Sequence, residues 1–141
     1  MLVGTSWAPF WDHTMGNGLV EVHWEAAFGR WAGERDAMQY QTRWATQIGL
    51  TPVLRWQAAD DGPHWFVEAG IGANIVTPIY RRHRKSFSTA FNFGDHVGIG
   101  WRFGASDRHE LALRIQHFSN AGIKLPNPGE NFRQLRYTCS F

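Results

Sequence analysis

Hydrophobic and polar residues alternate along most of this chain with a period of two. In the clearest run, "HWFVEAGIGANI", the odd positions of 65–75 are apolar, whereas positions 68, 70, 72 and 74 are polar or glycine. Successive side chains of a β-strand point to opposite faces, so this alternation predicts strands with one apolar and one polar face. Four other runs share it: 20–28, 87–103, 111–116 and 135–141.

Two further segments fit the pattern less cleanly. "QIGLTPVLRWQ", residues 47–57, contains Pro52, which cannot donate a ladder hydrogen bond, but it still indicates a sixth strand. Part of "WAPFW", residues 7–11, is interpreted as the remnant of a seventh.

Two architectures share this alternation. In a soluble sandwich or open sheet the apolar faces pack inside, whereas in an outer-membrane barrel they face lipid and the polar faces fill the lumen. Charged residues on the polar faces suit a narrow lumen, and Phe141 ends the last run as a terminal aromatic, which looks like the assembly signal of bacterial outer-membrane proteins. The turns alternate between short (58–62, 104–108) and long (29–38, 77–86, 120–131). We therefore predict an all-β, antiparallel up-and-down outer-membrane β-barrel forming one domain over 1–141.

Composition narrows the function classes. The net charge of +2 comes from 14 basic and 12 acidic residues, a balance that argues against a dedicated nucleic-acid binder. Cys139 is the single cysteine, so neither an internal disulfide nor a cysteine zinc site is expected. No segment approaches the roughly 18 apolar residues of a membrane helix, while eight tryptophans and ten phenylalanines suit a membrane interface.

The amino-terminal segment "MLVGTSWAPFW" lacks the features of a secretory signal. Barrels of this type have an even number of strands, with eight the smallest. Because only six strands and part of a seventh are recognisable, we expect one or two strands and an export signal to be missing upstream of Met1. The expected location is the bacterial outer membrane.

The stretch "IQHFSNAGIKLPNPGE", residues 115–130, carries the candidate chemistry. Strand parity puts His117 and Ser119 on one face, continuing the apolar stripe of Leu111, Leu113 and Ile115. A serine nucleophile needs a neighbouring base, and the base needs a third group that orients it. Glu130 can supply that group if the loop 120–129 returns the chain beside His117, and Asn120 or a backbone N–H can stabilise an oxyanion.

His-x-Ser alone is a weak signal, because an interfacial histidine beside a solvated serine has the same spacing. The longer segment "HFSNAGIKLPNPGE", however, closely resembles the signature of the outer-membrane lipid A 3-O-deacylases, the PagL family. "VEAGIGA" and "FNFGDHVGIGWRF" resemble preceding strands of that family, and the resemblance spans about 18–141.

The resemblance implies an eight-stranded barrel that hydrolyses the 3-position acyl ester of lipid A and releases a 3-hydroxy fatty acid without metal or cofactor. It implies His117 as base, Ser119 as nucleophile, Glu130 as orienting acid and Asn120 as helper at the oxyanion. By strand parity from Phe141, however, Glu130 falls on the lumen face and the next residue on the outer face. A one-residue shift or a bulge is needed to bring Glu130 to the histidine.

The expected partners are lipid A or lipopolysaccharide and membrane lipid, with no nucleic acid; a homodimer is compatible with an outer-wall site. Arg81, Arg82, Arg84 and Lys85 form a basic cluster that either grips lipopolysaccharide phosphates or is simply a solvated loop. The alternative function is a non-enzymatic small outer-membrane barrel, an adhesin or structural protein. Charged residues on the polar faces, such as Glu25, Glu68, Arg55 and Arg114, are interpreted as pairs filling the lumen.

Overall fold

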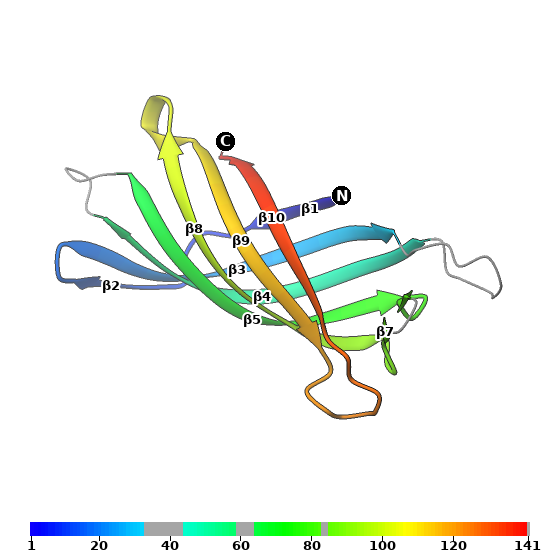
Figure 1. The fold of residues 1–141 in the computed structure, drawn as a ribbon. Helices are drawn as coiled ribbons and strands as arrows, with labels where there is room; N and C mark the ends of the chain where they lie inside the picture. Colours follow the sequence, from blue (N-terminus) through cyan, green and yellow to red (C-terminus); the bar gives the residue numbers. More distant parts are fainter. Residues whose placement is uncertain (33–43, 59–63, 83–84, 141) are drawn as a thin grey trace.

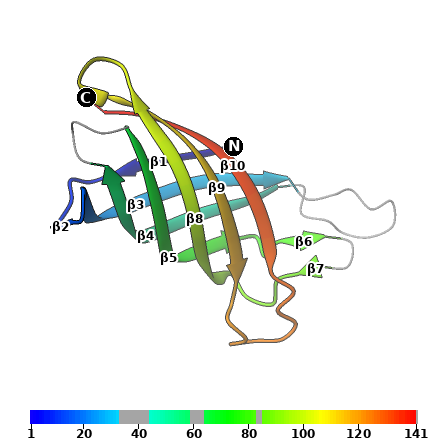
Figure 2. The same cartoon turned by 60° about the vertical axis from the view of Figure 1, so that its left-hand side comes forward.

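Six long strands, each paired antiparallel with the next, form one strongly curved sheet (Figures 1 and 2). The computed structural model describes residues 1–32, 44–58, 64–82 and 85–140. The long strands are β3 (Gly18–Ala32), β4 (Trp44–Ala58), β5 (Trp65–Thr77), β8 (Phe91–Phe103), β9 (His109–Ser119) and β10 (Glu130–Cys139). Pro52 lies within β4, and neither it nor Thr51 has a partner in the β4–β5 register.

The seventh position in the sheet is a strand in two pieces. β1 (Leu2–Ser6) pairs with residues 25–29 of β3, and β2 (Trp11–Met15) pairs with residues 18–22. The interpretation of part of 7–11 as the remnant of a seventh strand holds for Trp11, which begins β2, while residues 7–10 join the two pieces. Pro9 in this linker lacks the N–H that a continuous ladder requires. β1 and β10 lie at the two edges of the sheet.

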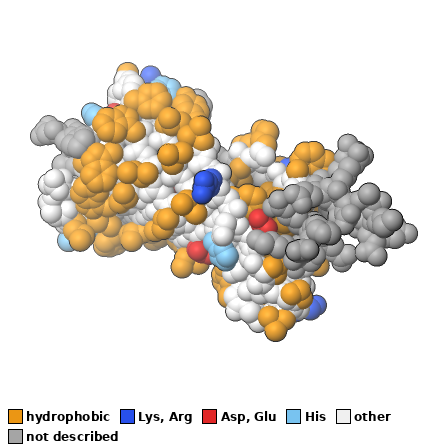
Figure 3. Space-filling model, viewed as in Figure 1, with side chains coloured by type: hydrophobic (Ala, Val, Ile, Leu, Met, Phe, Trp, Pro, Cys, Tyr) orange, Lys and Arg blue, Asp and Glu red, His pale blue; other side chains and the backbone are white. Residues whose placement is uncertain are grey.

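The apolar face of the sheet points outward. On β9, Leu113 is 63 % exposed whereas Arg114 is 3 % exposed, and the same alternation runs along β5. Hydrophobic side chains accordingly cover much of the outer surface of the sheet (Figure 3). This confirms the predicted barrel-type arrangement, in which the apolar face of the sheet points toward lipid.

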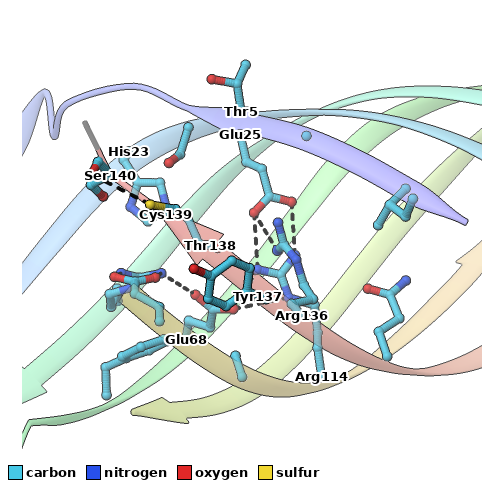
Figure 4. A pocket seen from close by; sticks show the side chains of 18 of the residues that line it. Thr5, His23, Glu25, Glu68, Arg114, Arg136, Tyr137, Thr138, Cys139 and Ser140 are labelled. Atoms are coloured by element: carbon cyan, nitrogen blue, oxygen red, sulfur yellow. Dashed lines mark hydrogen bonds and ion pairs between the residues drawn. The ribbon is translucent and has the colours of Figure 1, made fainter. Parts of the chain in front are cut away.

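Ion pairs fill the inner side of the sheet, as predicted. Arg114 binds Glu25 at 2.9 Å and Glu68 at 2.5 Å, and the two glutamates also bind Arg136 and Arg55 respectively. Figure 4 shows Glu25 in contact with Arg114 and Arg136, and all three side chains line a cavity of about 810 Å³. Because three guanidinium groups meet three carboxylates once Glu110 on Arg55 is included, the charges in this lumen network balance.

An aromatic cluster occupies the lumen behind the end of β9. Trp31 packs against Phe118 and Phe132, each with ring centroids 4.7 Å away, and against Tyr80 and Phe87. Phe87 was expected on the outer stripe of a strand over 87–103. That expectation was wrong: β8 begins at Phe91, and Phe87 is buried, with its N–H donating to the carbonyl of Tyr80.

The connections have the predicted asymmetry wherever the structure describes them. A 3-10 turn, η1 (Ala105–Asp107), joins β8 to β9, whereas β9 and β10 are joined by residues 120–129. β6 (Arg81–Arg82) and β7 (Lys85–Ser86) pair with each other in the connection between β5 and β8. The turn at 58–62 lies largely outside the described residues. No helix in the described ranges is long and apolar enough to cross a lipid bilayer.

Candidate active site

His117 and Ser119 lie together at the end of β9 on the outer face. Both are half-buried, and Phe118 between them points into the aromatic cluster of the lumen, where it is 1 % exposed. Residues two apart on a strand have Cα atoms roughly 6.5–7 Å apart, so their side chains can lean into contact. The fold thus places the predicted nucleophile and base side by side on the wall that faces lipid.

The imidazole of His117 is contacted from two sides, by Asn131 of β10 and by Gly129, which precedes that strand. Its Nδ1 lies 2.6 Å from Oδ1 of Asn131, which is its partner in the β9–β10 register. Its Cε1–Nε2 edge lies against Gly129: a Cβ on that glycine would come within 2.6 Å of Cε1 and 3.2 Å of Nε2. Gly129 also has a φ of 62°, the left-handed region that favours glycine.

Glu130 lies on the other face of the sheet. It pairs with Phe118, is 7 % exposed, and belongs to a ladder that continues without interruption to Cys139. The shift or bulge that the resemblance required is absent from this ladder. Because side chains alternate between faces, a regular register directs Asn131 and not Glu130 toward His117.

Asn120 holds the turn that follows Ser119. Its side chain is 1 % exposed, and its amide nitrogen donates to Ser88 Oγ at 2.9 Å and to the Lys124 carbonyl at 2.7 Å. Its Oδ1 accepts the N–H of Gly122, and its own N–H donates to Asn127 Oδ1. The Asn120 amide is therefore committed to the loop, which suits a positioning role better than direct donation to an oxyanion.

The loop 120–129 is hydrogen-bonded to the connection between β5 and β8. Ser88 Oγ donates to the carbonyl of Lys124 at 2.7 Å and accepts from Asn120. The connection that carries the basic cluster therefore reaches the same end of the sheet as Ser119. Arg84 lies outside the described residues, and for the other members of the cluster, Arg81, Arg82 and Lys85, the structure describes only the backbone.

An outer groove of about 590 Å³ begins at His117. Asp95, which pairs with His117 from β8, lies at the same end. The rest of the groove is mostly apolar and crosses five neighbouring strands, β9, β8, β5, β4 and β3. Its lining includes Ile115, Val97, Ile71, Ala69, Pro52, Leu54 and Val22. A long apolar ligand fits such a surface, with its polar end at the histidine.

Sequence reasoning missed two residues of this site. Asp95 interrupts the apolar parity of β8, between Phe93 and Val97, and a charge on a lipid-facing stripe is a usable signal for function. Gly129 carried no such signal, since its contact with His117 depends on the shape of the loop. Among the described residues no group of three or more His, Cys, Asp or Glu side chains is placed to hold a metal ion.

A Gly129→Ala variant is expected to lower the turnover of any His117-dependent reaction by about 10–100-fold, because a displacement of a catalytic group by about 1 Å can cost that much. Gly122→Ala is the matched control: Gly122 has a φ of 80° and open space around its would-be Cβ. Both variants carry the left-handed strain, but only one touches the imidazole. Equal losses in the two variants, measured as initial rates, would contradict the assigned contact.

Comparison with known proteins finds a matching family and similar relatives. The family described as "Lipid A 3-O-deacylase (PagL)" matches residues 1–140. A "Lipid A deacylase PagL" of Bordetella bronchiseptica is 42% identical over 95 residues, which are 67% of this chain and 50% of that protein. One of Pseudomonas aeruginosa is 30% identical over 138 residues, 96% of this chain and 74% of that protein.

A solved structure has the same fold. The chain described as "Crystal structure of the outer membrane enzyme PagL" superposes with a TM-score of 0.83 at 26% identity, covering 99% of this chain and 89% of that one. The match with the Bordetella relative spans half of that protein's length.

Proposed function

The chain belongs to the lipid A 3-O-deacylase (PagL) family, and from that premise we propose that it is an outer-membrane ester hydrolase acting on lipid A. The reaction cleaves the acyl ester at the 3-position of the proximal glucosamine and releases a 3-hydroxy fatty acid. The observation that carries the proposal is the position of His117 at one end of an apolar groove on the lipid-facing wall, with Ser119 two residues further along β9 on the same face.

In the first half-reaction, Ser119 Oγ attacks the ester carbonyl carbon while Nε2 of His117 takes the hydroxyl proton. The tetrahedral intermediate collapses, the bond to the sugar oxygen breaks, and His117 returns the proton to that oxygen. Water then attacks the acyl-serine, again giving a proton to Nε2, and the fatty acid leaves as Ser119 regains its proton.

Backbone N–H groups in the turn after Ser119 are the proposed oxyanion donors, an interaction typically worth ~3 kcal/mol in the transition state. Asn120 supports them as a positioning residue through its bonds to Ser88 and Lys124. Glu130, which the resemblance assigns as the orienting acid, lies on the lumen face, and the ladder partner of His117 is Asn131.

The substrate reaches the site within the membrane. An acyl chain lies in the apolar groove, which removes it from lipid at little cost, while the sugar ester stays at the height of Ser119. The basic cluster of Arg81, Arg82, Arg84 and Lys85 is proposed to contact the lipid A phosphates, because arginine binds phosphate in a bidentate manner. Association into a homodimer remains a prediction.

The test is mass spectrometry of lipid A after incubation with the purified chain, folded in detergent micelles. We expect the loss of one 3-hydroxyacyl group and the appearance of the free 3-hydroxy fatty acid. A Ser6→Ala variant carries the same kind of substitution on β1, away from the site, and should keep the parental activity. Unchanged lipid A with protein whose folding is verified by heat-modifiable gel migration would refute the enzyme and favour a non-enzymatic barrel.

A further inference from the structure

The residue that contacts His117 is an amide and not a carboxylate. Asn131 is paired with His117 in the ladder, and its Oδ1 lies 2.6 Å from Nδ1. An amide oxygen only accepts hydrogen bonds, so Nδ1 must carry the proton and donate it. The lone pair then resides on Nε2, which is the nitrogen that a neighbouring hydroxyl needs as its base.

The third group of a serine triad has two roles, and the contact with Asn131 performs one of them. The third group fixes the tautomer and orientation of the imidazole, and when it is a carboxylate it also stabilises the charged imidazolium. An asparagine performs only the first, as in the Cys-His-Asn sites of papain-like proteases. His117 and Asn131 therefore form a competent pair for orientation, without charge compensation.

Glu130 cannot replace Asn131 in this register. Its side chain is on the lumen face, one strand position away, beside Phe118 and behind the sheet. A local bulge would bring it to the outer face, but the ladder from Glu130 to Cys139 contains none. A register slip of one residue would also do so, but it would reverse every side chain from Phe132 to Cys139. That slip would turn Leu135 inward and Arg136 away from Glu25, which it now binds at 2.6 Å.

We propose that Asn131, and not Glu130, is the positioning residue for His117, so that the site is Ser119–His117–Asn131. This inference rests on the proposed deacylase function and refines it. Asn131 touches the base and not the substrate, and it acts by presenting Nε2 toward Ser119.

Charged side chains on neighbouring elements are part of the setting of His117. Asp95 faces it from β8, Arg133 lies two positions along β10 on the same outer face, and Lys124 is in the connecting loop. On β9 itself the outer-face neighbours Ile115 and Ser119 are uncharged. These groups are common to all the variants below, so a difference between variants reports on position 131 or 130.

The test compares the parent with Asn131→Ala, Asn131→Asp and Glu130→Gln in micelles. The first readout is the ¹⁵N spectrum of the histidine rings, with His117 assigned by its absence in His117→Gln. We expect Asn131→Ala to lose the Nδ1–H tautomer signal of His117, and Asn131→Asp and Glu130→Gln to keep it. The second readout is deacylation kinetics, where Asn131→Ala should lower kcat by about 10–100-fold with KM nearly unchanged.

Asn131→Asp should retain activity and move the lower-pH limb of the pH–rate profile to higher pH, because a carboxylate favours the protonated ring over the neutral one. Loss of the tautomer signal in Glu130→Gln but not in Asn131→Ala would overturn the proposal, as would an Asn131→Ala enzyme with parental kcat. If the parent releases no fatty acid, the deacylase proposal fails, but the tautomer readout still decides which residue holds His117.

Discussion

A Ser119→Ala variant is expected to lose about 10⁴-fold or more of the deacylation rate, because removing the nucleophile of a serine hydrolase leaves only binding and oxyanion stabilisation. The variant removes one hydroxyl from a half-buried position at the end of β9, so the sheet and the groove should be retained. The loss should therefore appear in kcat, with KM for lipid A little changed. Release of the 3-hydroxy fatty acid, followed by mass spectrometry over time, measures it.

The control for this variant is Ser88→Ala. Ser88 belongs to the loop network at the same end of the sheet, where its hydroxyl donates to the Lys124 carbonyl. Its removal should lower activity far less than removal of Ser119. Residual activity of Ser119→Ala within tenfold of the parent would eliminate Ser119 as nucleophile, even if the deacylase reaction itself were observed.

An Arg114→Met variant is expected to lower the free energy of unfolding by about 3 kcal/mol, the low end of the range for breaking a buried ion pair. Arg114 is 3 % exposed and joins Glu25 to Glu68, which come from β3 and β5. Without it, the lumen network holds one carboxylate in excess. We expect a loss at the low end of this range because each glutamate retains a second ion pair, Glu25 with Arg136 and Glu68 with Arg55. Urea titration of micelle-folded protein, read by heat-modifiable migration, gives the measurement.

Two further variants separate charge from packing in this prediction. Arg108→Met removes an exposed arginine in the turn before β9 and should change stability by less than about 0.5 kcal/mol. Arg114→Met combined with Glu68→Gln removes the excess carboxylate and should recover part of the loss. If the double variant is no more stable than Arg114→Met, the unpaired charge is not the cause.

The faces of the strands were predictable from the sequence because burial on a strand has a period of two. Leu113 and Arg114 differ in exposure as their parity requires, and the whole of β5 follows the same rule. The break in the first strand was harder to place. Residues 7–11 are rich in aromatics and read as strand, but Pro9 interrupts the ladder, and β1 and β2 pair on either side of it.

The details of the candidate site depended on register, which the sequence leaves open. The parity count already set Glu130 on the lumen face and Asn131 outside, but only the β9–β10 ladder shows that no bulge reverses them. The pairing of Arg114 with Glu25 joins residues 89 positions apart, and nothing local in the chain specifies that pair. Phe87 was misplaced because its alternation with β8 is accidental: a hydrogen bond to Tyr80 turns it into the lumen.

The outward position of the groove decides how such an enzyme encounters its substrate. Because the groove opens on the lipid-facing wall and not into the central cavity, the proposed reaction would receive its lipid by lateral diffusion in the leaflet. The rate is then governed by the mole fraction of substrate in the bilayer, and inert lipid slows the reaction by surface dilution while the bulk concentration stays constant. The fatty acid released in the proposed reaction would enter the same membrane and would compete with new substrate for the groove.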